Sequence, residues 1–549
     1  MLELRPYQQS AVDDIRTALV NSSRNRVICE APTGAGKTVL FSYIVQNAEK
    51  KGNRTLILTN RTELLTGTGG TLKNFGINPV YIMAGRKYPP DGNTFVGMAQ
   101  TLKNRIDKPE WLDWFRTLDL IIIDEAHLQE FNKFFQEDIF NGKTVIGFSA
   151  TPKRGGKQRQ LGEDYDAIVH TLTVVELIDM GFLMPDMYFG SELSPDMKGV
   201  KKDIKGDYSE SDMFKKYDTP KLYGGVIEAY KEHTPNTISI VFCSNIIHCV
   251  RTCKQFNDNG IPAKFLVSKM SKPKRPYEDE PLDRKEASPE WVRYWEKIKY
   301  YEEYNEAMSM YSGERHQMIK QWKNGDFKVM INAGILTTGF DYPAIETVVL
   351  FRATISEVLY LQMLGRASRI SPGTHKTHFS ILDFGSNAER LGGYKMPRKW
   401  HLWHESKSGL GVPAVKECAI PWKDINGKLG CGDFILASSK ICPSCGYIYP
   451  EKKQGADVSL TLMVEQSDGS VKPVKPIDEM NFEELEAFAK IQKFKQMWVI
   501  VQVYLREGKE GLESYRKFKK YNHGWKTKIF SHIPAKVIHE RMQIDKELI

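Results

Sequence analysis

The feature that most constrains the fold of this chain is the segment APTGAGKT, residues 31–38. It follows a short apolar segment at 26–30 and precedes a helix-like stretch at 38–51, which is the context of a phosphate-binding loop. Gly34 and Gly36 let backbone amides approach a phosphate, and the helix N-terminus adds amides and a favourable dipole. A glycine-rich turn formed by chance would lack this context. The segment therefore predicts a nucleotide site between a strand and a helix of a parallel sheet.

Polar residues of this loop and an acidic pair further along could supply the chemistry of phosphoryl transfer. Lys37 can reach the terminal phosphates, and the Thr38 hydroxyl can ligate magnesium. Asp124 and Glu125 directly follow an apolar run at 118–123. There Asp124 can hold magnesium through water, and Glu125 can orient and deprotonate an attacking water. A solvated acidic strand end is the alternative interpretation, which the presence of the phosphate-binding loop disfavours.

Short apolar segments recur along the chain and are separated by helix-like stretches. The segments predicted as strands are 26–30, 55–59, 94–98, 118–124, 145–149, 237–243, 263–267, 328–332, 347–351 and 378–383. Near-continuous apolar strands that alternate with helices are typical of parallel sheets covered on both faces. The pattern predicts an α/β protein with two domains, at 1–170 and 171–390.

Several motifs resemble those of superfamily 2 helicases of the DEAD/DEAH-box type, in the same order. Besides the phosphate-binding loop they are LRPYQ (4–8), TNRTELL (59–65), VGMAQTL (96–102), DEAH (124–127), SATP (149–152), IVFCS (240–244), ILTTGFDYP (335–343) and YLQMLGRASR (360–369). Within the superfamily, the chain is most similar to bacterial RadD-like repair helicases and related phage DNA helicases. A long charged and aromatic insert at 269–313 departs from that pattern.

The resemblance implies two tandem RecA-like domains with ATP and Mg²⁺ between them. The catalytic residues it implies are Lys37, Asp124, Glu125, Gln362, Arg366 and Arg369. Those implied in nucleotide binding are Arg5, Gln8, Thr33, Gly34, Ala35, Gly36, Lys37, Thr38, Gly339 and Asp341. Those that would couple the two sites are Ser149, Thr151 and Thr338, and those that would bind nucleic acid are Asn60, Arg61, Gln100 and Thr101.

Two arginines of the last motif belong to the second domain. Arg366 and Arg369 are three residues apart, which predicts that they lie on one face of a helix. Because they come from the second domain, they can stabilise the charge of the transferring phosphate only when both domains close over ATP.

Four cysteines at 391–455 predict a small zinc-binding module. Cys418, Cys431, Cys442 and Cys445 have the spacing C-x12-C-x10-C-x2-C, and four thiolates suit a tetrahedral structural zinc ion. Only the last pair has the spacing typical of a metal site, so one CxxC turn with unrelated thiols is the alternative. His401 and His404 are nearby alternative ligands.

The segment 456–549 is expected to be a basic helical C-terminal domain. The net charge of the chain is +9, and residues 490–541 alone hold 13 basic and 4 acidic residues. Cations there are mixed with aromatic residues: Tyr515, Arg516, Lys517, Lys519, Lys520, Tyr521, Trp525, Lys526 and Lys528. This mixture suits phosphate contact and base stacking, and an ordinary solvated helix face is an equal alternative.

The insert at 269–313 is expected to contain a long helix. Its aromatic residues could line a partner surface, although packing against the second domain is the favoured interpretation: Trp291, Tyr294, Trp295, Tyr300, Tyr301 and Tyr304.

The motifs together predict an ATP-dependent DNA helicase or translocase. Its expected partners are single-stranded, forked or branched DNA and proteins of replication or repair. An RNA helicase, a duplex translocase without unwinding, and an ATP-gated nucleic-acid-binding factor are the alternatives. The start of the sequence lacks a secretory pattern, and the apolar runs are too short to span a bilayer, so a cytoplasmic setting without a membrane partner is expected.

Overall fold

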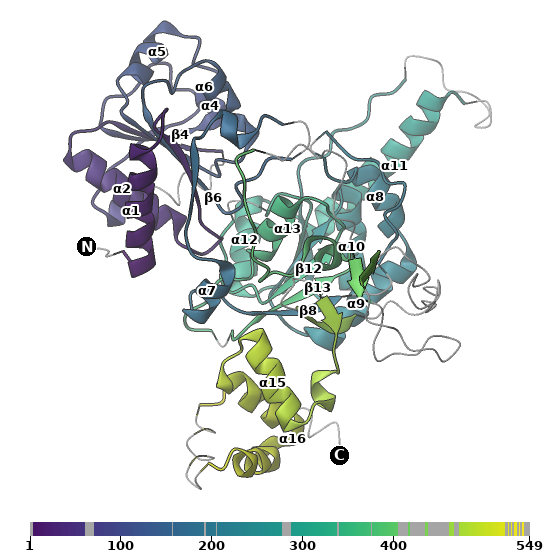
Figure 1. Cartoon of the computed structure of the whole chain (residues 1–549). Coiled ribbons are helices and arrows are strands. Elements are labelled where there is room, and N and C mark those ends of the chain that lie inside the picture. Colours follow the sequence, from purple (N-terminus) through teal and green to yellow (C-terminus); the bar gives the residue numbers. More distant parts are fainter. Residues whose placement is uncertain are drawn as a thin grey trace. The chain divides into compact units, whose positions relative to one another are not determined.

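The computed structural model describes residues 4–60, 71–155, 158–190, 194–204, 206–276, 287–337, 340–374, 376–403, 415–417, 434–436, 460–465, 471–521, 525, 529, 532–534, 537–538 and 541–542. The chain divides into two compact units, Met1–Leu402 with Ser459–Ile549 and Trp403–Val458. The larger unit contains two sheets with helices around them (Figure 1).

The first sheet has seven parallel strands in the order β3-β4-β2-β5-β6-β1-β7. Their bounds are β1 Arg26–Glu30, β2 Thr55–Thr59, β3 Val80–Ile82, β4 Thr94–Met98, β5 Leu120–Asp124, β6 Thr144–Ser149 and β7 Ala167–His170. The helices of this domain are α1 Pro6–Val20, α2 Lys37–Lys50, α4 Ala99–Lys103, α5 Pro109–Arg116 and α6 Asn132–Gln136, with 3₁₀ turns at Gln129–Phe131 and Leu161–Glu163.

Both faces of this sheet are buried, and strand β1 shows why. Side chains alternate along a strand, so Val27 and Cys29 pack with α1 and α2, whereas Ile28 packs on the other face with Trp114 of α5 and Phe134 of α6. A strand that is apolar on both faces has a continuous hydrophobic sequence, which is how these strands could be predicted.

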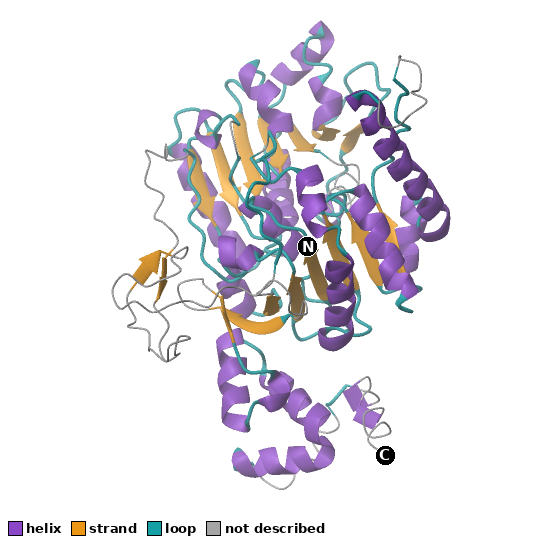
Figure 2. Ribbon diagram, turned by 90° about the vertical axis from the view of Figure 1, so that its right-hand side faces the viewer, coloured by secondary structure: helices purple, strands orange, loops and turns teal. Residues whose placement is uncertain are grey.

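The second sheet has the order β10-β11-β9-β12-β13-β8-β16-β17. Figure 2 shows the strands and helices of the protein from a second side. Its first six strands are parallel: β8 Asp186–Gly190, β9 Ser239–Cys243, β10 Ala263–Leu266, β11 Val329–Asn332, β12 Thr347–Phe351 and β13 Phe379–Asp383. The helices of this domain are α8 Glu210–Tyr217, α9 Pro220–His233, α10 Ile246–Asp258, α11 Pro289–Tyr311, α12 Arg315–Asn324, α13 Glu357–Leu364 and α14 Asn387–Leu391. The prediction of two parallel-sheet α/β domains is confirmed.

Two strands from the C-terminal segment extend the second sheet, which differs from the expectation of a wholly helical tail. β16 Thr461–Glu465 pairs antiparallel with β8, and β17 Val471–Pro473 pairs with β16. Leu462, Met463 and Val464 are buried there. The pairing satisfies backbone groups at the edge of β8 that would otherwise have no strand partner.

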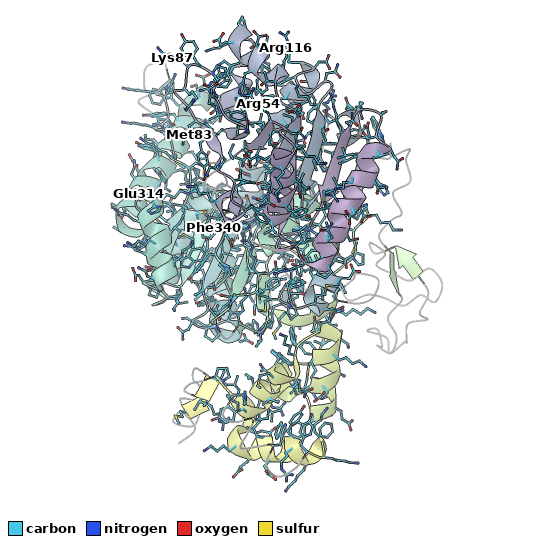
Figure 3. All side chains as sticks on the ribbon, turned by 90° about the vertical axis from the view of Figure 1, so that its left-hand side faces the viewer. Arg54, Met83, Lys87, Arg116, Glu314 and Phe340 are labelled. Carbon is cyan, nitrogen blue, oxygen red and sulfur yellow. The ribbon has the colours of Figure 1, made fainter. Side chains whose placement is uncertain are left out.

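The insert contains the expected helix, α11. Trp291 and Tyr304 are buried, and Arg251 of α10 binds Glu303 of α11 at 2.8 Å. Trp291 and Tyr304 therefore pack inside the protein, which agrees with the favoured interpretation that aromatic residues of the insert pack against the second domain. Glu314, labelled in Figure 3, follows the insert and accepts a hydrogen bond from the Gln317 amide, so it caps the N-terminus of α12.

Helices α15 Phe482–Gln492 and α16 Gln496–Phe518 follow β17, after a 3₁₀ turn at Ile477–Glu479. Asn481 and Glu484 form a reciprocal cap at the start of α15. The linker between the first and second sheets forms α7 Val174–Asp179. In the smaller unit, the described residues form the antiparallel strands β14 Val415–Glu417 and β15 Phe434–Leu436.

Candidate active site

The loop after β1 has the backbone conformation that phosphate binding needs. Gly34 and Gly36 have φ of +94° and +83°, which residues with a Cβ rarely adopt. A Cβ at Gly34 would also lie 2.5 Å from a methyl carbon of Leu183. Lys37 begins α2, and its Nζ donates to the Ala31 carbonyl at 3.3 Å. The predicted loop is therefore present between a strand and a helix N-terminus.

Residues of the first helix close one side of this loop. Gln8 Nε2 and the Tyr7 hydroxyl both donate to the Ala35 carbonyl, at 3.3 and 2.8 Å. The Arg5 guanidinium lies 3.8 Å from the ring centroid of Phe182. Gln8 thus contacts the loop directly, and Arg5 lies beside Tyr7 and Phe182. Phe182 was missed in the sequence, where a single aromatic residue in a linker carries no signal.

The acidic pair lies at the carboxyl end of β5. Glu125 has a φ of +52°, which costs a residue with a side chain about 1–2 kcal/mol. Its amide donates to Asp124 Oδ1 at 3.1 Å. Burial, and then the neighbouring Glu125 charge, raise the pKa of Asp124 to about 7, while Lys37 opposes this shift. A buried carboxylate with too little positive charge around it fits the oxygen ligands that Mg²⁺ prefers.

A chain of hydrogen bonds joins the two domains through His127. His127 Nδ1 lies 2.8 Å from Ser149 Oγ, which also accepts from the Thr151 amide at 3.0 Å. Gln362 of α13 donates through Nε2 to His127 Nε2 at 3.2 Å. Burial lowers the pKa of His127, so the ring is neutral and can accept at Nε2 while donating from Nδ1. The sequence motifs predicted no role for His127, the last residue of DEAH.

The second domain also touches the phosphate-binding loop directly. A Cβ at Gly365 would lie 2.9 Å from both Cβ and Oγ1 of Thr33. Glycine is therefore required where the end of α13 meets the loop. Lys153, just after the SATP motif, binds Glu357 at the start of α13 at 2.9 Å. These contacts bring the predicted residues of both domains together.

The prediction that Arg366 and Arg369 share a helix face is wrong. Helix α13 ends at Leu364, Arg366 lies in the following turn, and Arg369 forms a β-bridge with Leu183. The helix ends there because the chain bonds to the linker instead: the Met184 amide donates to the Ser368 carbonyl at 2.7 Å.

Both arginines contact the segment 335–343, which resembles motif V of superfamily 2 helicases. Arg366 is buried and donates to the Phe340 carbonyl, and Arg369 forms an ion pair with Asp341. Phe340 is labelled in Figure 3. Thr338 and Gly339 of the same segment lie outside the described residues.

A buried lysine holds this segment to the end of the last motif. Lys376 Nζ donates to the carbonyls of Pro343, Ile345, Ala367 and Arg369 at 2.5–3.0 Å. Burial lowers the pKa of Lys376 to about 7. The four carbonyl acceptors favour the charged form instead, because a neutral amine has fewer N–H donors than an ammonium group. This role could not be predicted from the sequence, because the four carbonyls come from two segments, 343–345 and 367–369, that are distant from each other along the chain.

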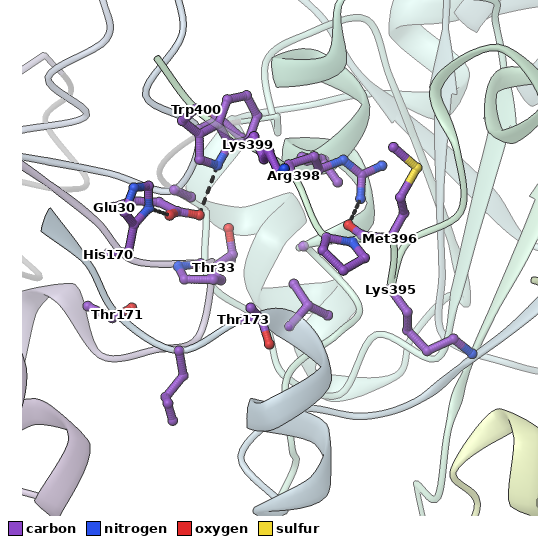
Figure 4. A pocket seen from close by; sticks show the side chains of 18 of the residues that line it. Glu30, Thr33, His170, Thr171, Thr173, Lys395, Met396, Arg398, Lys399 and Trp400 are labelled. Carbon is purple, nitrogen blue, oxygen red and sulfur yellow. Dashed lines mark hydrogen bonds and ion pairs between the residues drawn. The ribbon is translucent and has the colours of Figure 1, made fainter. Parts of the chain in front are cut away.

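A cavity of about 520 Å³ lies beside the loop, lined by Thr33, Thr151 and residues 394–401 (Figure 4). Trp400 Nε1 donates to Glu30 Oε1 at 2.8 Å, and His170 binds the other oxygen of that carboxylate. The hydrogen bond with Glu30 raises the pKa of His170. The segment that closes this cavity could not be recognised from sequence, since it carries no motif.

The predicted nucleic-acid residues lie at the carboxyl edge of the first sheet. Asn60 directly follows β2, and Gln100 and Thr101 lie on α4 directly after β4, with Gln100 exposed. Arg61 lies outside the described residues.

Two of the aromatic and basic tail residues predicted to contact nucleic acid are buried or paired within the protein. Tyr515 is fully buried and Arg516 is held by Glu513 at 2.6 Å, so both belong to the helical core. The proposed stacking role therefore fails for Tyr515. Lys526 and Lys528 lie outside the described residues.

The zinc prediction concerns residues that the structure does not describe: Cys418, Cys431, Cys442, Cys445 and His404. Among the described residues, no group of three or more His, Cys, Asp or Glu side chains could hold a metal ion. In the same part of the chain, no helix has the length and apolar character needed to cross a membrane.

Two families match this chain in the order of its two domains. Residues 1–154 match the family described as Type III restriction enzyme, res subunit (ResIII), and residues 292–371 match the Helicase conserved C-terminal domain. The chain thus carries the two domains that superfamily 2 helicases have, in the order that the sequence motifs predict.

Individual relatives include proteins from yeast, phage and bacteria. A Saccharomyces cerevisiae protein named as an ATP-dependent helicase, IRC3, is 31% identical over 405 residues, which are 69% of this chain and 51% of that protein. A 51.5 kDa protein of a Lactococcus phage is 23% identical over 87% of this chain and 92% of its own length. The Escherichia coli type I restriction enzyme EcoAI endonuclease subunit is 25% identical over 70% of this chain and 46% of its own length. The chain thus spans about half the length of the yeast relative.

Proposed function

We propose that the protein is an ATP-dependent motor that moves along DNA and remodels it. The observation that carries this proposal is the assembly of both halves of the site: Gly365 lies against Thr33 of the phosphate-binding loop, and Gln362 binds His127. A nucleotide bound at the loop would therefore be sensed by both domains, as a translocation cycle requires.

Hydrolysis would use the residues predicted from sequence. Thr38 and Asp124 would hold Mg²⁺, which would neutralise charge on the phosphates. Lys37 would contact the terminal phosphates, and Glu125 would take a proton from the attacking water. Arg366 and Arg369 would have to leave the Phe340 carbonyl and Asp341 to reach the phosphate. Such an exchange of partners would couple hydrolysis to the motif V segment.

DNA is favoured over RNA as the partner. The ResIII family and the EcoAI relative are both described as restriction enzymes, whose substrate is DNA. The likeness to RadD-like helicases favours forked or branched DNA in repair or replication in a cytoplasmic setting. Cys418, Cys431, Cys442 and Cys445 would form a structural zinc site, and the basic C-terminal tail would add contacts to DNA.

Substitution Glu125→Gln tests the mechanism. We expect it to preserve ATP and DNA binding and to lower the turnover number by at least about 100-fold, because the general base is lost. Glu130→Gln is the matched control, since Glu130 is an exposed carboxylate close in sequence. Normal hydrolysis by the Glu125→Gln protein would refute the mechanism.

Stimulation of ATP hydrolysis tests the partner. The rate should rise with single-stranded or forked DNA more than with blunt duplex or RNA. Stronger stimulation by RNA would favour an RNA helicase, stimulation by duplex alone a duplex translocase, and negligible turnover with every nucleic acid a binding factor.

A further inference from the structure

The insert forms a basic groove outside the active site. A hollow of about 800 Å³ lies between residues 270–276 and the N-terminal half of α11. We call it the insert groove. One carboxylate, Glu290, lines it beside five cations: Lys272, Lys274, Arg275, Arg293 and Lys297. All five cationic residues are exposed, and no carboxylate within the described part of the chain pairs with Lys272, Lys274 or Lys297.

The groove is part of a well-anchored structure. Trp291 is 1% exposed, and the Arg275 guanidinium lies 5.3 Å from its ring centroid. At the other end of α11, Ser312 donates to the Phe265 carbonyl of β10 at 3.0 Å. The cations are therefore presented by a helix packed on the second domain, with Arg293 and Lys297 one turn apart on the same face. Holding like charges close together costs free energy unless an anion binds there.

The insert groove begins at the carboxyl edge of the second sheet, where the motor would hold the nucleic acid. Its first wall follows β10, whose last residue, Leu266, pairs in register with Asn332 of β11. Asn332 in turn pairs with Phe242 of β9. Because these strands are parallel, the groove and the segment 335–343 leave the sheet at the same edge. The tyrosines Tyr294 and Tyr300 also line the groove, which adds aromatic surface to the cations.

We infer that the insert groove binds the phosphate backbone of the nucleic acid on which the motor acts. This inference rests on the proposed function. Exposed cations with aromatic side chains recognise nucleic acid largely without regard to sequence, because phosphates carry no sequence information. The insert would then hold the strand against the second domain while the domains open and close.

The double substitution Lys274→Glu with Lys297→Glu tests the groove. Binding of a fluorescently labelled single-stranded oligonucleotide is measured by anisotropy between about 50 and about 300 mM salt. We expect at least about tenfold weaker affinity at the lowest salt, and a slope of log affinity against log salt that is shallower by about 1.4. The neutral pair Lys274→Gln with Lys297→Gln should give the same loss of slope with a smaller loss of affinity.

The matched control is Lys50→Glu with Lys51→Glu, which changes the charge equally. Both residues are exposed at the end of α2, at the opposite edge of the first sheet. Far-ultraviolet circular dichroism and thermal unfolding establish that each variant is folded. Affinity and salt slope equal to the control would overturn the groove inference alone. Failure of the unsubstituted protein to bind any oligonucleotide would overturn the proposed function as well.

Discussion

At the scale of the residue, buried polar side chains set the positions of the candidate catalytic groups. Lys376 is the strongest case, because the three N–H donors of one ammonium group are shared among four carbonyls from the segments 343–345 and 367–369. Asp341 and Arg366 lie just before these segments in the chain. The lysine touches no reacting atom, so it acts as a positioning residue.

Substitution Lys376→Met should lower the free energy of unfolding by about 3–5 kcal/mol, because it leaves several buried carbonyls without a donor. Urea unfolding followed by tryptophan fluorescence measures the change. Lys320→Met is the control, since Lys320 is an exposed lysine of α12 in the same domain. An unfolding curve for Lys376→Met that matches the control would show that the four hydrogen bonds contribute nothing to stability.

At the scale of the element, the segment 393–402 acts as a strap between the two domains. Arg398 binds Glu357 of α13 at 3.1 Å and donates to backbone carbonyls of the strap and the residues before it. Trp400 then binds Glu30 of β1, and the Leu402 carbonyl accepts from the Gly162 amide at 2.9 Å. The strap therefore begins on the second domain and ends on the first.

Substitution Arg398→Met should loosen this strap, because its carbonyls lose their common donor. We expect hydrogen exchange of residues 394–401 to quicken by at least about tenfold, with exchange in the first sheet unchanged. Lys399→Met, a change at the neighbouring exposed lysine, should leave exchange as it is. Equal exchange in both variants would mean that Arg398 does not hold the strap.

At the scale of the whole molecule, buried histidines make the stability of the second domain depend on pH. His248 is a buried residue of α10 that packs against the ring of Phe351, with Nδ1 2.9 Å from Ser244 Oγ. Burial, then the charges of Arg352 and Arg251, lower its pKa from 6.5 to about 3. Between these two values the unfolded chain binds more protons than the folded chain, so His248 reduces stability as the pH falls.

The comparison of the unsubstituted protein with His248→Gln isolates this effect from other groups that titrate in the same range. Glutamine keeps an acceptor for Ser244 but takes up no proton. As the pH falls from about 6 to about 5, we expect the unsubstituted protein to lose up to about 1.4 kcal/mol relative to the variant. Urea unfolding at both pH values measures the difference, and a constant difference would contradict the buried, neutral state of His248.

The sequence by itself determined the features that depend on neighbouring residues. The loop 31–38 was predictable because its glycines, lysine and threonine are contiguous, and the acidic pair because it ends an apolar strand. The two parallel sheets were predictable since strands buried on both faces are continuously apolar.

The tertiary structure alone decided the features whose partners are distant in sequence. These are the contact of Gln362 with His127, the end of α13 before Arg366, the burial of Lys376 and the addition of β16 to the second sheet. A helix that the sequence pattern would continue ends where its backbone finds other hydrogen-bond partners, and a lysine that could be exposed is buried where carbonyls converge. Such outcomes depend on which groups the folded chain brings within hydrogen-bonding distance, and no local pattern encodes that.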